Sequence, residues 1–287
     1  MYVVGIDISK ESLDVCLLDE QGQRQQETFV NRKPGINKLH NWLKKRGAKT
    51  AQVCLEATGV YGDAVAETLH QRGYTVSVVN PARIKAYAAS QMRRNKTDAL
   101  DAALIADYCR TQQPPAWTPP PAQVKELRAL VRHLDDLKQE RQRASNRLEA
   151  QPDAGAIVQH LRSQLTLLDK QIAHTRRLIR DHLDRYPDLK QEHELLTSIP
   201  GIGDITACQL LAELGDVSRF DKVGEVVAFV GLNPYQHQSG RKRATHGISR
   251  MGRASLRAAL YLPAIVAKRC NARLRDWAEQ LRQRGLT

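Results

Sequence analysis

The chain is poor in aromatic residues and lacks the cysteine and histidine spacings of a metal site. Aromatic residues make up 5% of its 287 residues, which argues against base stacking as the main mode of nucleic-acid binding. The five cysteines are scattered, without zinc-like spacing, which predicts reduced thiols in a cytosolic protein. The nine histidines form no paired ligand spacing. No signal peptide or long apolar run is visible, so we expect neither secretion nor membrane insertion.

Positive charge is present in excess. The chain carries 44 Lys and Arg against 31 Asp and Glu, a formal net charge of +13. An excess of this size suggests a polyanionic partner, although a merely soluble basic protein would show it too. Hydrophobic residues make up 41% of the chain, enough to build cores in one large or two to three small domains.

Residues 1–110 alternate strand-like and helix-like stretches. Gly22 lies in a turn between two of the strands, so an antiparallel hairpin leads the fold. The order predicts an α/β domain with a mixed sheet in which the first strand is central. The expected strands are Tyr2–Ile8, Leu13–Leu18, Gln26–Asn31, Ala51–Glu56 and Thr75–Val79, and the expected helices are Gly35–Arg46 and Gly62–Arg72.

The rest of the chain divides into three further segments. Residues 111–121 are rich in proline, which predicts a semi-rigid linker and a domain boundary. Residues 122–188 repeat apolar side chains at coiled-coil-like spacing, which predicts two long helices in a hairpin. The charged outer faces of this hairpin fit a solvated surface or a dimerisation arm that also binds nucleic acid. Residues 189–287 predict a small all-α domain.

Four carboxylates in separate segments are candidate metal ligands. Asp7 lies within the first apolar run, Glu56 ends a later one, and Asp98 and Asp101 are three apart, on one face of a helix. An acid in an apolar strand is costly unless it is paired or bound to a metal. Converging acids would repel one another without divalent cations, and oxygen ligands suit Mg²⁺. Two such ions can clamp the attacking and leaving oxygens of a phosphodiester.

A glycine-rich corner in the C-terminal part is a candidate phosphate site. Residues 196–207 form a helix, a tight turn with Gly201 and Gly203, and a second helix, which resembles the helix-hairpin-helix motif. The glycines permit a sharp turn, and free N–H groups at the second helix would face a phosphate. A plain helix–helix corner is the simpler interpretation.

A serine precedes a strongly basic stretch. Residues 240–257 hold six cations and no acid, which predicts a phosphate cradle. Ser239 lies just before them, and an activated hydroxyl there can attack phosphorus. On its own, a Ser-Gly pair is usually just a turn. The six cations are Arg241, Lys242, Arg243, Arg250, Arg253 and Arg257.

Many of these segments resemble the DEDD transposases of the insertion-sequence "one-ten" family, which is related to the pilin-gene invertases. The motifs occur in order, cover nearly the whole chain and are jointly specific, although each is weak alone. In the N-terminal part they are Gly5–Lys10, Leu55–Tyr61, Val79–Pro81 and Asn95–Ala102. In the C-terminal part they are Ser198–Gly203, Phe229–Leu232, Gln238–Gly240, and Ile248–Gly252 with Leu256 and Arg257.

The resemblance implies a RuvC-like (RNase H-like) fold for residues 1–110, with the acids Asp7, Glu56, Asp98 and Asp101 binding Mg²⁺, or alternatively Mn²⁺. It implies that Ser239 is the nucleophile and that acids and serine come from different subunits of a homo-oligomer, a dimer or a tetramer. It also implies a non-coding bridge RNA that pairs with donor and target DNA. Many relatives continue beyond the position of Thr287, and we expect that a missing helix there weakens assembly or that this member is short.

We therefore interpret the chain as a transposase, a DNA recombinase of an insertion sequence, acting in the bacterial cytoplasm at the nucleoid. The expected nucleic-acid contacts are Lys10, Lys96, Gly201, Gly203 and the six cations of residues 240–257. Three alternatives remain. A Holliday-junction-type endonuclease would use water and need no serine, and a non-catalytic scaffold would only bind. An actin-like sugar kinase shares the Gly5–Lys10 loop, but the net charge and the missing glycine-rich adenosine segments argue against it.

Overall fold

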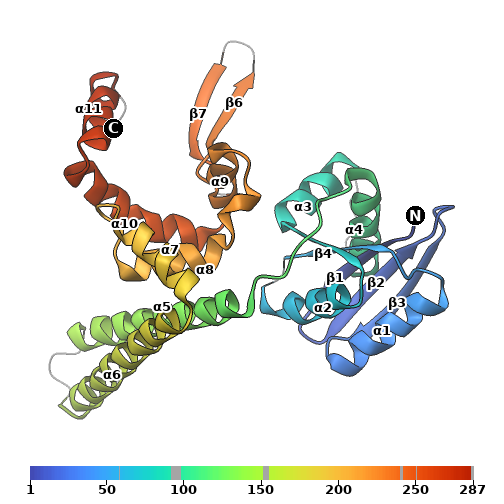
Figure 1. The fold of residues 1–287 in the computed structure, drawn as a ribbon, viewed down its shortest axis with the longest axis horizontal. Helices are drawn as coiled ribbons and strands as arrows, with labels where there is room; N and C mark the ends of the chain where they lie inside the picture. Colours follow the sequence, from blue (N-terminus) through green and yellow to red (C-terminus); the bar gives the residue numbers. More distant parts are fainter. Residues whose placement is uncertain (58, 92–97, 151–154, 240–241, 250, 286–287) are drawn as a thin grey trace. The chain divides into compact units, whose positions relative to one another are not determined.

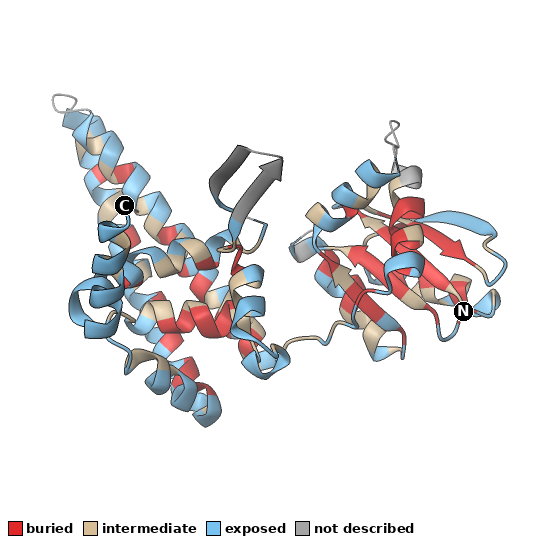
Figure 2. Cartoon of the chain, turned by 90° about the horizontal axis from the view of Figure 1, so that it is seen from above, coloured by how far each residue is buried: buried red, intermediate tan, exposed pale blue. Residues whose placement is uncertain are grey.

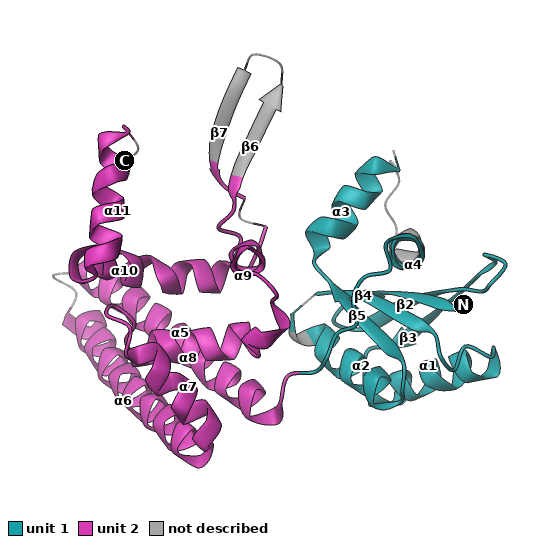
Figure 3. Cartoon of the chain, turned by 45° about the horizontal axis from the view of Figure 1, so that its top comes forward, with its two compact units in different colours: residues 1–119 teal, residues 120–287 magenta. Residues whose placement is uncertain are grey.

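The computed structural model describes the chain except residues 58, 92–97, 151–154, 240–241, 250 and 286–287, and it describes only the backbone of residues 60, 98–100, 235–239 and 242–246. The chain forms two compact units, Met1–Pro119 and Pro120–Thr287 (Figure 3). Their division falls inside the proline-rich stretch. Buried side chains gather in the interior of each unit (Figure 2).

Unit 1 is built on a mixed sheet of five strands in the order β3-β2-β1-β4-β5. β1 pairs antiparallel with β2 and parallel with β4, which confirms the predicted mixed α/β sheet with a central first strand. A central strand is buried on both faces, which explains its continuous apolar run. The strands are β1 (Val3–Ile8), β2 (Ser12–Leu18), β3 (Arg24–Val30), β4 (Gln52–Glu56) and β5 (Thr75–Val79).

Helices cover both faces of this sheet (Figure 1). Alternate residues of β1 point to opposite sides: Val4 and Ile6 join one core with α1 and α2, and Val3 joins the other core with α3 and α4. Two helical layers therefore enclose the sheet. The helices are α1 (Lys33–Lys45), α2 (Val60–Gln71), α3 (Pro81–Ser90) and α4 (Asp98–Gln112).

Helix α4 lies directly on the backbone of β1 at Gly5. A Cβ atom at Gly5 would come within 2.3 Å of the Ala102 carbonyl oxygen and 2.3 Å of the Ala106 amide nitrogen. Both of these atoms belong to the backbone of α4, so no side-chain rotation can relieve the clash. Only glycine therefore allows this close packing of helix on strand.

The proline-rich stretch is attached to unit 1 as far as Trp117. The carbonyl oxygen of Pro114 accepts hydrogen bonds from Gln52 Nε2 at 3.0 Å and Ser77 Oγ at 3.1 Å. The Trp117 amide donates to the Val76 carbonyl at 2.6 Å. The segment thus covers part of β5, an edge strand that would otherwise expose unpaired backbone groups. As far as Trp117, the predicted linker is therefore attached to unit 1 by hydrogen bonds.

Unit 2 is mainly helical. Its longest helices, α5 and α6, form the predicted helical hairpin: Val124 and Leu127 of α5 share a core with Ile179 and Leu183 of α6. None of the helices that the structure describes is both long and apolar enough to cross a membrane. The helices are α5 (Ala122–Glu149), α6 (Gly155–Arg185), α7 (Pro187–Thr197), α8 (Asp204–Leu214), η1 (Val217–Arg219), α9 (Val223–Val230), α10 (Ala254–Cys270) and α11 (Ala272–Gln283).

The prediction of an all-α C-terminal domain is wrong for residues 234–239 and 242–248. These residues form two antiparallel strands, β6 (Pro234–Ser239) and β7 (Lys242–Ile248). Both strands are rich in polar and charged residues, so they lack the apolar alternation by which a half-buried strand is identified in a sequence.

We expect Gly5→Ala to destabilise unit 1 by about 1–3 kcal/mol, because the new methyl group forces α4 away from β1. Urea unfolding of the full chain measures this free energy. Gly155→Ala is the control, since a Cβ there meets nothing within 4 Å. Equal stability of the Gly5 variant and the unmodified chain would contradict this account of the packing.

Candidate active site

Asp7 and Glu56 lie beside each other at the carboxyl ends of two neighbouring parallel strands, β1 and β4. We call this end of the sheet the acidic edge. Gly5 pairs with Cys54 and Ile6 with Leu55 in the parallel ladder of β1 and β4, so Asp7 and Glu56 are the next residues in register. Each shares its face of the sheet with residues of the α4-side core. Both acids are half-buried. The carboxyl ends of parallel strands are where ligands bind in open α/β sheets.

Helix α4 brings Asp101 to the same edge. A Cβ at Gly22 would lie 3.0 Å from the Arg110 guanidinium, and Gly22 follows β2 near the start of β1. The last turn of α4 therefore lies at the start of β1, and its first turns lie at the end of β1, where Asp7 is. Asp98 is the first residue of α4, but its side chain lies outside the described residues, as does all of Lys96.

The charge of Glu56 acts on the core beneath it. The pKa of the Cys54 thiol is raised, first by its hydrogen bond with Cys109 on α4, then by burial and by the charges of Cys109 and Glu56. Cys54 and Glu56 are two residues apart on β4, so both lie on the α4 side of the sheet. Asp7 accepts a hydrogen bond from the Ile8 amide at 3.1 Å on Oδ1.

A further acid near this site, Asp14, is not among the residues predicted from the sequence. It pairs directly with Asp7 across β1 and β2, so both carboxylates occupy one face of the sheet. Thr28 Oγ1 donates to Asp14 Oδ1 at 2.6 Å, and Ser12 Oγ donates to Oδ2 at 3.4 Å. The sequence does indicate Asp14 as a candidate, because it interrupts an apolar strand just as Asp7 does.

Some of the polar side chains near the acidic edge form hydrogen bonds within the chain, and others are exposed. Ser9 and Ser12 share a hydrogen bond of 2.8 Å between their hydroxyls, so Ser9 bonds within the turn after β1. Lys10 is exposed in that turn. Asn80, which follows β5, accepts from the Ala82 amide at 2.9 Å and caps α3. Because Lys10 is exposed, it remains a candidate for contact with a phosphate.

The chemistry of the acids fits a divalent cation, since carboxylate oxygens are the ligands that Mg²⁺ prefers. Among the described side chains, no group of three or more His, Cys, Asp or Glu residues is arranged to hold a metal ion. That statement does not extend to Asp98. The acids that the backbone brings to one edge are Asp7, Asp14, Glu56 and Asp101.

Ser239 is the last residue of β6, in unit 2, where its Cα pairs with that of Lys242. The side chains of Ser239, Lys242 and Arg243, and all of Arg241 and Arg250, lie outside the described residues. Their predicted roles therefore remain predictions. The side chains that the structure describes lie at the base of the hairpin, where both strands meet the helices.

Two glycines cross at the base of this hairpin. Gly231 ends α9 with φ +80°, and a Cβ there would meet the Gly252 amide nitrogen at 2.4 Å. A Cβ at Gly252 would meet the Phe229 carbonyl oxygen at 2.3 Å. The Ser249 amide donates to the Asn233 carbonyl at 2.7 Å. The chain segments that lead into β6 and out of β7 are therefore held together at backbone contact.

Two of the residues that are predicted to contact nucleic acid also hold the base of the hairpin in place. Arg257 Nη1 donates to the carbonyls of Val230 at 2.9 Å and Gly252 at 2.8 Å. Arg253, the N-cap of α10, forms an ion pair with Glu213 and lies over the ring of Phe229. Both guanidinium groups have structural partners within the chain, and their contact with nucleic acid stays a prediction.

Glu213 is the buried acid of this network, with 6% of its side chain exposed. Arg132 of α5 donates to its Oε1 at 3.1 Å from Nε and 3.0 Å from Nη2. Burial raises the pKa of this carboxyl, but the charges and hydrogen bonds of Arg253 and Arg132 outweigh burial and hold the pKa below its ordinary value of 4.5. The network links α5, α8 and the start of α10.

The glycine-rich corner joins α7 and α8, but Gly201 has a packing role. Its φ is +103°, and a Cβ would meet the Pro263 carbonyl oxygen at 2.9 Å and the Ala267 amide nitrogen at 3.2 Å on α10. Gly203 is the N-cap of α8, whose first turn carries the acidic Asp204. The corner is therefore fixed against α10, and phosphate binding by its amides stays a prediction.

The chain is similar to transposases and to a related DNA-inverting protein. Residues 4–154 match the transposase family DEDD_Tnp_IS110, and residues 193–279 match the "Transposase IS116/IS110/IS902 family". The pilin gene-inverting protein of Moraxella bovis is 33% identical, over 92% of this chain and 82% of the relative. The transposase for insertion sequence element IS1111A of Coxiella burnetii is 25% identical, over 90% of this chain and 75% of the relative. The solved structure of T. thermophilus RuvC in complex with a Holliday junction substrate aligns with 41% of this chain and 100% of its own at a TM-score of 0.30 and 14% identity.

We expect Glu213→Gln to lower the free energy of unfolding by about 1–3 kcal/mol at neutral pH, because it removes charge-assisted hydrogen bonds to two arginines. The pKa of Glu213 is lowered on folding, so its stabilisation is present above pH 4.5 and is lost as the pH falls through the lowered pKa. Urea unfolding as a function of pH measures both effects.

The control for that prediction is Glu192→Gln, since Glu192 is an exposed acid on α7. The difference between the Glu213 variant and the unmodified chain should shrink as the pH falls below 4.5. A stability difference that stays constant through this range would exclude Glu213 as an ionised partner of the arginines.

Proposed function

The chain belongs to the IS110 family of transposases and related DNA recombinases, and from this premise we propose how it cleaves and rejoins DNA. Asp7, Glu56, Asp98 and Asp101 would hold Mg²⁺, or Mn²⁺ in its place, in an RNase H-like nuclease domain. Ser239 would supply the nucleophilic hydroxyl. The observation that carries the proposal is the meeting of strand β1, strand β4 and helix α4 at one acidic edge of the sheet.

The proposed chemistry is a transesterification in two steps. The Ser239 oxygen bonds to phosphorus and loses its proton, the bond to the leaving deoxyribose oxygen breaks, and a phosphoserine is formed. A new DNA hydroxyl then displaces the serine, so the phosphodiester is rebuilt without an external energy source. Bound at the acids, Mg²⁺ would polarise the scissile phosphate as a Lewis acid. Arg241, Lys242, Arg243 and Arg250 would neutralise the charge that develops on the phosphate oxygens.

We propose further that the site is composite, made from the acids of one subunit and the serine of another in a homo-oligomer. The acids belong to Met1–Pro119 and the serine to Pro120–Thr287, two compact units with separate cores. The base of the β6–β7 hairpin is fixed within its own unit by Glu213, Arg253 and Arg257. A serine held on such a rigid base can be presented to the acids of a partner copy.

A non-coding bridge RNA is the proposed source of target choice. The support is the family resemblance, the low aromatic content of 5% and the formal charge of +13, which suit binding to phosphate backbones. Base pairing with donor and target DNA would then select the sequence, and the protein would act on the DNA of the nucleoid in the cytoplasm.

We expect Ser239→Ala to abolish a covalent protein–DNA adduct on a denaturing gel, because no hydroxyl remains to bond phosphorus. Asp7→Asn should abolish the adduct as well, and both variants should still bind DNA. Ser255→Ala and Asp63→Asn are matched controls, since both residues are exposed in helices, and both controls should form the adduct. Mg²⁺-dependent cleavage by the Ser239 variant without an adduct would instead identify an endonuclease that uses water.

We expect one structured RNA species to copurify with the chain when it is expressed beside its native flanking DNA. Direct sequencing of the bound RNA measures this, and expression from the coding sequence alone is the control. A guide should contain segments complementary to the donor and target DNA. Bound RNA of arbitrary sequence in both preparations would contradict guidance by RNA.

A further inference from the structure

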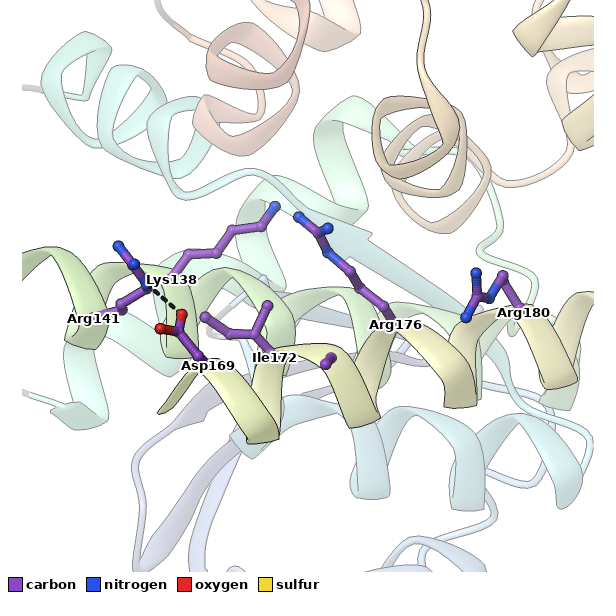
Figure 4. Close-up of a pocket in the computed structure, with 7 residues that line it drawn as sticks. Lys138, Arg141, Asp169, Ile172, Arg176 and Arg180 are labelled. Carbon is purple, nitrogen blue, oxygen red and sulfur yellow. Dashed lines mark hydrogen bonds and ion pairs between the residues drawn. The ribbon is translucent and has the colours of Figure 1, made fainter. Parts of the chain in front are cut away.

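We propose that the groove between α5 and α6 is a second DNA contact of this chain, which binds the phosphate backbone of a duplex. The groove is open to solvent and has a volume of about 580 Å³. Lys138 and Arg141 of α5 line one side, and Arg176 and Arg180 of α6 line the other (Figure 4). The inference goes beyond the chemistry proposed for Ser239, because it concerns binding and involves no strand cleavage.

Positive charge dominates this groove. Asp169 is the acid among the residues that line it, and its Oδ1 accepts from Arg141 Nε at 2.6 Å. Lys138 lies 3.6 Å from Asp135 on its own helix. Arg176 and Arg180 are exposed and form no ion pair or hydrogen bond within the described part of the chain. Two guanidinium groups therefore face the groove with their donors available.

The spacing of these two arginines suits two phosphates of one DNA strand that are about two steps apart. Arg176 and Arg180 are four residues apart, so they share a face of α6 and lie about 6 Å apart along its axis. Phosphates of one DNA strand advance by about 3.4 Å along the duplex axis, so the pair matches about two steps. Like charges at this spacing repel and weaken an isolated helix, and a bound phosphate would remove that repulsion.

The uncharged lining of the groove favours contact with the backbone over contact with bases. Ile172 and Ala173 are part of this lining, and neither side chain can form a hydrogen bond to a base edge. The lining that the structure describes contains no aromatic side chain, so unpaired bases have no surface on which to stack. Arginine forks match the phosphate oxygens and read no sequence. A duplex backbone is the partner that fits, and DNA is the nucleic acid that a transposase joins.

The test is the salt dependence of DNA binding by the full chain with both arginines replaced, Arg176→Gln and Arg180→Gln. The slope of log K on log salt is negative, and each lost phosphate contact makes it shallower by about 0.9, so the slope of the double variant should be shallower by about 1.8. Referred to 1 M salt, this slope corresponds to roughly 60-fold weaker binding at 0.1 M. Fluorescence anisotropy with duplexes of several arbitrary sequences measures both, and the loss should be the same for all of them.

The matched control is Lys170→Gln with Arg177→Gln. These residues are exposed on the same helix and lie outside the groove. Each double variant replaces two cations by Gln, so the charge removed is equal. The proposal predicts a small change in slope for the control and melting temperatures equal to that of the unmodified chain for both double variants. An equal loss in both double variants would overturn it, and so would unchanged DNA binding with weakened binding of an RNA duplex.

Discussion

The contact between α4 and β1 at Gly5 is the constraint on which the acidic edge depends. The Ala102 carbonyl and the Ala106 amide of the helix lie where any side chain of residue 5 would have to go. This contact fixes the distance between helix and strand, and the position of the Arg110 guanidinium near Gly22 shows in which direction the helix runs. Together they bring the first turns of α4 to the end of β1 that carries Asp7.

A similar constraint operates in the second unit. Gly231 and Gly252 cross at backbone contact, and the ion pairs of Glu213 with Arg132 and Arg253 connect this crossing to the long helices. A buried carboxylate with two arginine partners keeps its charge, because the partners replace the water that burial removes. The base of the β6–β7 hairpin is thus tied to the helices of its own unit.

Four arginines of the chain lie in two kinds of environment. Arg253 and Arg257 contact backbone carbonyls and a buried acid, so they stabilise the fold around the hairpin. Arg176 and Arg180 have no such partners among the described residues and face an open groove. Composition counts both kinds equally, which is why a charge of +13 predicts a polyanionic partner without locating it.

The sequence by itself determined the mixed sheet, the central first strand, the helical hairpin and the family. Those features depend on local periodicity, such as the apolar run of β1, and on ordered motifs along the chain. Tertiary structure alone decided that Asp14 stands opposite Asp7, that Gly201 packs on α10, and that residues 234–239 and 242–248 pair as polar strands. The packing of Gly201 joins residues far apart in the chain, and the two strand pairings depend on a register that no local pattern of side chains specifies.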